Sequence, residues 1–68
     1  MKNKSKITGK TYEAEDCVFL INALQTFKYL DNGAELVDLI CGEKNRLVFV
    51  FSKEKTHNLY DKWCKYEL

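Results

Sequence analysis

The most informative part of the chain is the stretch Leu36-Val37-Asp38-Leu39-Ile40-Cys41-Gly42-Glu43-Lys44-Asn45-Arg46-Leu47-Val48-Phe49-Val50-Phe51. It contains two apolar runs, 36–41 and 47–51, which have the length of strands and are rich in β-branched and aromatic residues. Between them, residues 42–45 form a short polar segment of the length that joins antiparallel strands. The stretch therefore predicts a β-hairpin.

The second strand of this hairpin is apolar on both faces. Alternation places Leu47, Phe49 and Phe51 on one face and Val48 and Val50 on the other. The strand carries neither charge nor proline, two of the features that protect a free sheet edge. We therefore expect an unpaired edge of this strand to pair with a second copy across a two-fold axis.

A helix is expected before the hairpin, over residues 16–30, because apolar residues recur there at three- and four-residue steps. Asp16 is the expected N-cap. Gly33 follows the helix as a stop signal, because glycine readily adopts the left-handed conformation that ends many helices. The stripe expected to face the core consists of Cys17, Leu20, Ile21, Leu24 and Phe27.

A second helix is expected after the hairpin, over about residues 53–66, with Ser52 as its N-cap. Residues 6–13 alternate weakly around Gly9, so a short edge strand before the first helix is left open. The predicted architecture is a two-layer α+β fold of (β)αββα order, in which a small antiparallel sheet packs against two helices.

The length and composition indicate one globular domain. The chain has 68 residues, of which 46% are hydrophobic and 31% charged. Its net charge is +1, yet four lysines fall within the first ten residues. We expect residues 1–9 to be a basic, flexible N-terminal segment and residues 10–68 to be a single α+β domain.

The cellular setting is expected to be the cytoplasm, without a membrane partner. The first residues lack the apolar stretch of a secretory signal, and no window approaches the length of a membrane span. The three cysteines are odd in number and far apart, which is typical of a reducing compartment and not of a disulfide framework.

The residue types needed for catalysis or metal binding do not form a motif. Zinc ligands usually come in close pairs, whereas His57 and Cys64 are seven residues apart, or about 10 Å along a helix. A Cys/His nucleophile would also need an oxyanion hole, and the three glycines are isolated. We therefore expect a protein that is not an enzyme, with no catalytic residues, no metal and no cofactor.

The order of elements resembles a family of small uncharacterised domains from bacteria and their phages. The resemblance covers residues from about Lys10 to Leu68 and lies in the strand Arg46-Leu47-Val48-Phe49-Val50-Phe51, followed by a helix with the late aromatic Trp63. It implies a fold and a size, and no residue receives a role from it.

The sequence favours a small non-enzymatic protein-interaction module of a bacterium, phage or mobile element, which self-associates as a homodimer through a sheet edge. Inhibition of a partner protein is one form that such an interaction could take. The residues expected to make contacts are Arg46, Val48, Val50, Phe19 and Trp63. For two of them a place in the core is the favoured interpretation: Phe19 as a side wall of the core and Trp63 as one of the rings that close the core over the hairpin.

The alternative function is a nucleic-acid-binding accessory protein. It would use the N-terminal lysines together with scattered basic residues on the folded domain. The lysines concerned are Lys2, Lys4, Lys6 and Lys10.

Overall fold

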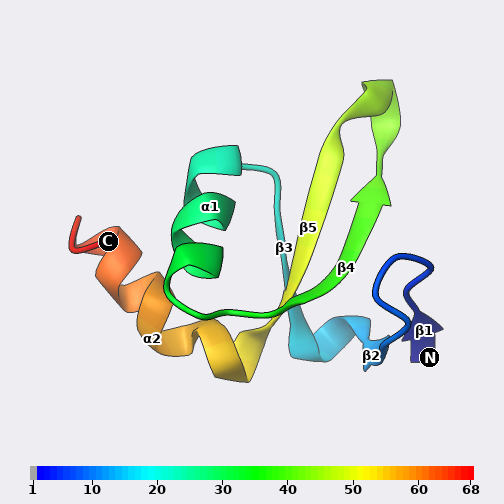
Figure 1. The fold of residues 1–68 in the computed structure, drawn as a ribbon, viewed down its shortest axis with the longest axis horizontal. Coiled ribbons are helices and arrows are strands. Elements are labelled where there is room, and N and C mark those ends of the chain that lie inside the picture. The colour runs from blue at the N-terminus through cyan, green and yellow to red at the C-terminus, as the bar shows by residue number, and fades with distance from the viewer. Residues whose placement is uncertain (1) are drawn as a thin grey trace.

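The structure is a computed structural model that describes residues 2–68. It contains, in chain order, β1 (Lys2–Lys4), β2 (Thr11–Glu13), the short 3-10 turn η1 (Ala14–Asp16), β3 (Cys17–Leu20), α1 (Ala23–Asp31), β4 (Leu36–Cys41), the turn η2 (Glu43–Asn45), β5 (Leu47–Ser52) and α2 (Lys53–Cys64). The strands form two antiparallel sheets, β1-β2 and β3-β5-β4. The expected α+β class is confirmed (Figure 1).

The hairpin of β4 and β5 is confirmed, but the expectation of a free edge on β5 is wrong. This strand is the centre of its sheet, with β4 on one side and β3 on the other. In the register, Phe49 pairs with Leu39 of β4 and with Leu20 of β3. Over residues 49–51 both rows of backbone groups on β5 are therefore used within the chain, so this part of the strand has no free edge that could pair with a second copy.

The prediction of a helix over residues 16–30 is also wrong for the first half of that range. Residues 17–20 form β3, and α1 begins only at Ala23. The N-cap is Asn22, whose Oδ1 accepts from the backbone N–H of Gln25 at 3.1 Å, whereas Asp16 lies in η1 and caps nothing. Pairing with β5 outweighs the helical spacing here, because a run of β-branched and aromatic residues fits a strand as well as a helix.

The end of α1 and the start of α2 agree with the sequence prediction. Gly33, just after α1, has a φ of 91°, in the left-handed region where glycine is favoured. Ser52 caps α2, because its Oγ accepts from the backbone N–H of Lys55 at 3.4 Å. Beside it, the hydroxyl of Thr56 donates to the carbonyl of Ser52 at 2.8 Å.

Both helices lie on one side of the three-stranded sheet (Figure 1). Phe51 points from β5 toward them, and the ring of Tyr29 on α1 packs against it edge to face, with ring centroids 5.5 Å apart. Both rings are fully buried. This aromatic pair is the centre of the core between the helices and the sheet.

The N-terminal hairpin, β1 with β2, lies on the other side of the sheet (Figure 1). It joins residues on both sides of the expected boundary between residues 9 and 10. Its second strand, β2, lies within the segment 6–13, for which the sequence did not decide whether a strand forms. Ser5 in its turn is buried. Val50 alternates with Phe51, so it faces the side on which this hairpin lies, and it too is fully buried. The chain thus covers the second face of β5 itself.

Strand β4 contains a register shift next to this hairpin. Leu36 pairs with Phe51 and Asp38 pairs with Val50, so Val37 is an extra residue. The carbonyl of Val37 accepts instead from the hydroxyl of Thr8, at 2.6 Å. The irregularity in β4 is therefore a point of attachment for the N-terminal segment.

Candidate interaction surface

Helix α1 places its polar side chains inside and its large apolar ones outside. Gln25, Thr26 and Tyr29 are its buried residues. On the opposite side Leu24 is 57% exposed, Phe27 61% and Leu30 44%. These three follow one another at steps of three residues, so they form a stripe along the helix. The apolar spacing predicts Leu24 and Phe27 in the core, and that prediction is wrong.

Hydrogen bonds explain why the polar side can be buried. The side-chain amide of Gln25 donates to the hydroxyl of Tyr29 at 3.1 Å, and the hydroxyl of Thr26 donates to the carbonyl of Asn22 at 2.9 Å. Within residues 2–68, every buried side-chain nitrogen or oxygen has a hydrogen-bond partner. Burial of these groups therefore leaves no uncompensated donor or acceptor, and folding does not require the apolar side of α1 to turn inward.

A groove continues the apolar stripe toward the C-terminal end of α2. It has a volume of about 460 Å³. Its lining consists of Leu24, Lys28, Trp63, Cys64, Tyr66 and Leu68. Tyr66 is 96% exposed, while Trp63 is half-buried. We call the stripe (Leu24, Phe27, Leu30) together with Trp63 and Tyr66 the α1 surface.

The residues predicted from the sequence to make contacts lie in separate places. Arg46 and Val48 line a small hollow beside the turn between β4 and β5. Phe19 is exposed on β3, and Trp63 belongs to the α1 surface. Val50 has no exposed area, because it packs inside the chain, and it therefore has no surface to offer a partner.

The N-terminal lysines do not form a free basic tail. Lys2 and Lys4 lie on β1, and Lys6 is exposed in the turn that follows. The ammonium group of Lys10 lies 2.6 Å from Oε2 of Glu35, at the start of β4. This ion pair holds the pKa of the Glu35 carboxyl below its usual value.

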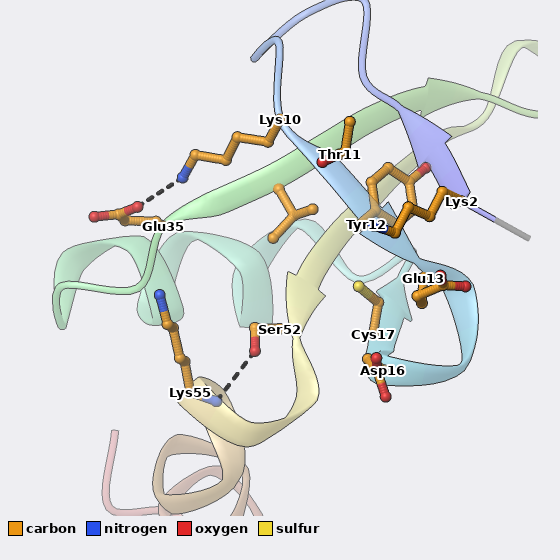
Figure 2. Close-up of a pocket in the computed structure, with 11 residues that line it drawn as sticks. Lys2, Lys10, Thr11, Tyr12, Glu13, Asp16, Cys17, Glu35, Ser52 and Lys55 are labelled. Atoms are coloured by element: carbon orange, nitrogen blue, oxygen red, sulfur yellow. Dashed lines mark hydrogen bonds and ion pairs between the residues drawn. The ribbon is translucent and has the colours of Figure 1, made fainter.

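A second hollow lies between the N-terminal hairpin and the body of the chain, with a volume of about 400 Å³. Figure 2 shows that side chains of both charges reach into it, among them Lys10 from the hairpin and Lys55 from α2. Its charged lining residues are Lys2, Lys10, Lys55, Glu13, Asp16 and Glu35. The balance of signs gives this hollow no preference for an anion or a cation.

A buried carboxylate joins the N-terminal hairpin to the sheet. Burial alone would raise the pKa of Asp38, but hydrogen bonds from Ser5, from Tyr12 and from the backbone N–H of Leu39 outweigh it and hold that pKa below its usual value. The hydrogen bond between Tyr12 and Asp38 raises the pKa of Tyr12 to about 12, and burial and the charge of Asp38 add to the shift. These shifts show a structural network whose charge is satisfied.

The cysteines and His57 do not come together. Cys17 is buried and lines the hollow beside the N-terminal hairpin, and burial raises the pKa of its thiol. Cys41 is exposed at the end of β4, and Cys64 is exposed at the end of α2. In the part of the chain that the structure describes, no three side chains of the types that bind metals lie in one cluster.

The sequence contained one signal that would have located α1 correctly. Asn22 followed three residues later by Gln25 has the spacing of an N-terminal capping motif. A helix that starts there puts Gln25 and Tyr29 on one side and Phe27 on the other. The direction in which that helix faces the sheet depends on the long-range pairing of β3 with β5, for which the spacing gives no signal.

Comparison with models of known protein families, with curated proteins and with solved structures gave no match for this chain. The resemblance to small bacterial and phage domains therefore stays a prediction. Among residues 2–68, no helix combines the length and the apolar character that a membrane span needs.

Proposed function

We propose that this chain is a small non-enzymatic protein-interaction module that contacts its partner through the α1 surface. One observation carries the proposal: α1 buries Gln25 and Thr26 while it exposes Leu24, Phe27 and Leu30. Single exposed apolar residues are ordinary on protein surfaces, whereas a contiguous set next to a groove is typical of binding sites.

The composition of the surface supports a protein partner. It combines three aromatic side chains with two leucines, and aromatic residues make up a large share of interface hot spots. Full burial of one such side chain contributes roughly 1.5–3 kcal/mol. Among the residues that the structure describes, Lys28 is the one with a charged side chain that lines the groove, so the surface offers little to a charged ligand.

The charges support the nucleic-acid alternative less well. A basic groove requires cations without nearby carboxylates, yet Lys10 is paired with Glu35, and Lys2 shares its hollow with Glu13 and Asp16. The bacterial or phage origin, the cytoplasmic location and the inhibition of a partner all remain predictions.

Photo-crosslinking tests the proposed function. The full chain, with p-benzoylphenylalanine in place of Phe27, is expressed in cells, irradiated and isolated under denaturing conditions. We expect a covalent adduct with a protein chain. The matched control carries the same group in place of Tyr60, which is 54% exposed on α2 and lies outside the α1 surface. If position 27 gives no more protein adduct than position 60, the proposal fails.

A further inference from the structure

The chain exposes more surface than the average folded monomer of its mass. Its accessible area is 5186 Å² for a mass of 8.0 kDa. The relation between mass and area in folded monomers gives about 4,450 Å² for this mass. The difference, about 700 Å², is close to the roughly 800 Å² that one partner contributes to an interface of standard size.

The buried core is correspondingly small. Four hydrophobic residues are buried among those that the structure describes, namely Cys17, Tyr29, Val50 and Phe51. The core of a chain shorter than about 70–80 residues rarely supplies more than about 3–5 kcal/mol, and small proteins often add a disulfide, a metal or a partner subunit. All three cysteines are free. Contact with a partner would therefore add stability that this core alone supplies poorly.

The character of the α1 surface fits a second copy of the same chain. The net charge of the chain is +1, and α1 carries one lysine, Lys28, and one aspartate, Asp31. A copy therefore meets almost no electrostatic repulsion, and the surface has no charge that would select an acidic or a basic partner. The stripe is also evenly spaced about its middle, with Leu24 three residues before Phe27 and Leu30 three residues after it. Such a stripe meets itself in a two-fold symmetric contact, where the same patch serves both subunits.

We infer that the partner of the α1 surface is a second copy of this chain, which packs its own α1 against it around Phe27 in a two-fold dimer. This inference rests on the proposed function, because it names the occupant of the same surface. The dimer differs from the one predicted from the sequence: it uses the outward side of a helix, and the sheet edges take no part in it.

Analytical ultracentrifugation of the full chain tests the inference, over concentrations of about 1 to 100 µM, where a modest dimer would be populated. The variant is Phe27→Lys. The matched control is Ile7→Lys, because Ile7 is 63% exposed and Phe27 is 61% exposed, and Ile7 lies in the turn of the N-terminal hairpin. We expect the mass of the wild type to approach twice the 8.0 kDa chain mass at tens of micromolar, as for a dimer with a dissociation constant of about 10 µM.

The two substitutions should differ. Phe27→Lys is expected to raise the dissociation constant at least about tenfold, the factor that corresponds to 1.4 kcal/mol, and Ile7→Lys to leave it unchanged. Circular dichroism verifies that each variant is folded. Should Phe27→Lys fail to fold, Leu24→Gln provides the same comparison with a smaller change.

A wild-type chain that stays monomeric over the whole range overturns the inference. So does a dimer that Phe27→Lys and Ile7→Lys weaken equally, because it would then use another surface. The proposed function is judged separately: an adduct of position 27 with a different protein supports it and overturns the dimer, whereas an adduct between two copies supports both.

Discussion

The hydroxyl of Tyr12 donates a hydrogen bond of 2.5 Å to Oδ2 of Asp38 and thereby joins the N-terminal hairpin to strand β4. Asp38 is buried, and it also accepts from the backbone N–H of Leu39 at 2.8 Å. Next to Asp38, the hydroxyl of Thr8 donates a hydrogen bond to the carbonyl of Val37 and also attaches the hairpin to β4. Polar contacts therefore make up much of the attachment between residues 2–13 and the sheet.

Removal of the Tyr12 hydroxyl should destabilise the chain. Tyr12→Phe keeps the ring but deprives a buried carboxylate of a donor, which is expected to cost about 1–3 kcal/mol of unfolding free energy. Urea unfolding followed by circular dichroism measures the change. The control is Tyr60→Phe, because Tyr60 is 54% exposed and lies outside the α1 surface, and it should change the free energy of unfolding by no more than about 0.5 kcal/mol. Equal stability of Tyr12→Phe and wild type would mean that the bond contributes nothing in solution.

Stability should depend on pH at both ends of the scale. The pKa of Asp38 is lowered by folding, so its contribution is present above the unfolded value of about 3.9 and is lost as the pH falls through the folded value. The pKa of Tyr12 is raised from 10.0 to about 12, so its contribution is present below pH 10 and is lost as the pH rises through about 12.

Thermal unfolding across the pH range, for wild type, Asp38→Asn and Tyr12→Phe, measures these two limits. We expect the unfolding temperature of Asp38→Asn to fall less steeply than that of the wild type as the pH is lowered. We expect the unfolding temperature of Tyr12→Phe to fall less steeply than that of the wild type as the pH is raised. Acid and alkaline limbs that are the same in all three proteins would contradict the role given to this pair.

The position of the first helix can be tested through its cap. Asn22→Ala removes the acceptor of the Gln25 backbone N–H and should cost about 0.5–2 kcal/mol. Asp16→Ala alters the residue that the sequence pattern favoured as N-cap; it is exposed in η1, and its replacement should change the free energy of unfolding by no more than about 0.5 kcal/mol. The reverse ranking in denaturant unfolding would place the start of the helix at residue 16.

The three thiols should react at two different rates. Cys41 and Cys64 are exposed, whereas Cys17 is buried and its pKa is raised by burial, so less of its reactive thiolate is present. With Ellman's reagent at pH 8 we expect two fast equivalents from the native protein and a third that appears only slowly. In urea all three should react quickly. Three fast thiols in the native state would indicate that the N-terminal hairpin does not cover Cys17.

Several elements of the fold were predictable because their signals are local. The β4–β5 hairpin follows from two apolar runs around a polar turn, and the end of α1 follows from Gly33. The second helix begins at Lys53 after the Ser52 cap, as the sequence predicts, and ends at Cys64, two residues earlier than expected. Each of these features depends on residues within one turn or one strand.

The features that the sequence did not reveal depend on long-range pairing. The run Cys17–Leu20 continues the apolar spacing of the helix, and only its pairing with β5 makes it a strand. Once that run is taken out of the helix, α1 starts at Ala23 and turns Phe27 outward. The sequence did not predict the α1 surface, because the same apolar residues had the spacing of a stripe that faces the core. Trp63 was a candidate contact although its spacing favoured the core, and Leu24 and Phe27 were expected in the core.

The irregular pairing of β4 has a consequence for how this chain avoids aggregation. An inward-pointing charge and an extra residue both make a strand a poor template for the strand of another molecule. Strand β4 has both, with Val37 outside the ladder and the carboxylate of Asp38 turned toward the N-terminal hairpin. The addition of a strand from another molecule, and so the growth of fibres, is thus disfavoured at the edge of the sheet that β4 forms.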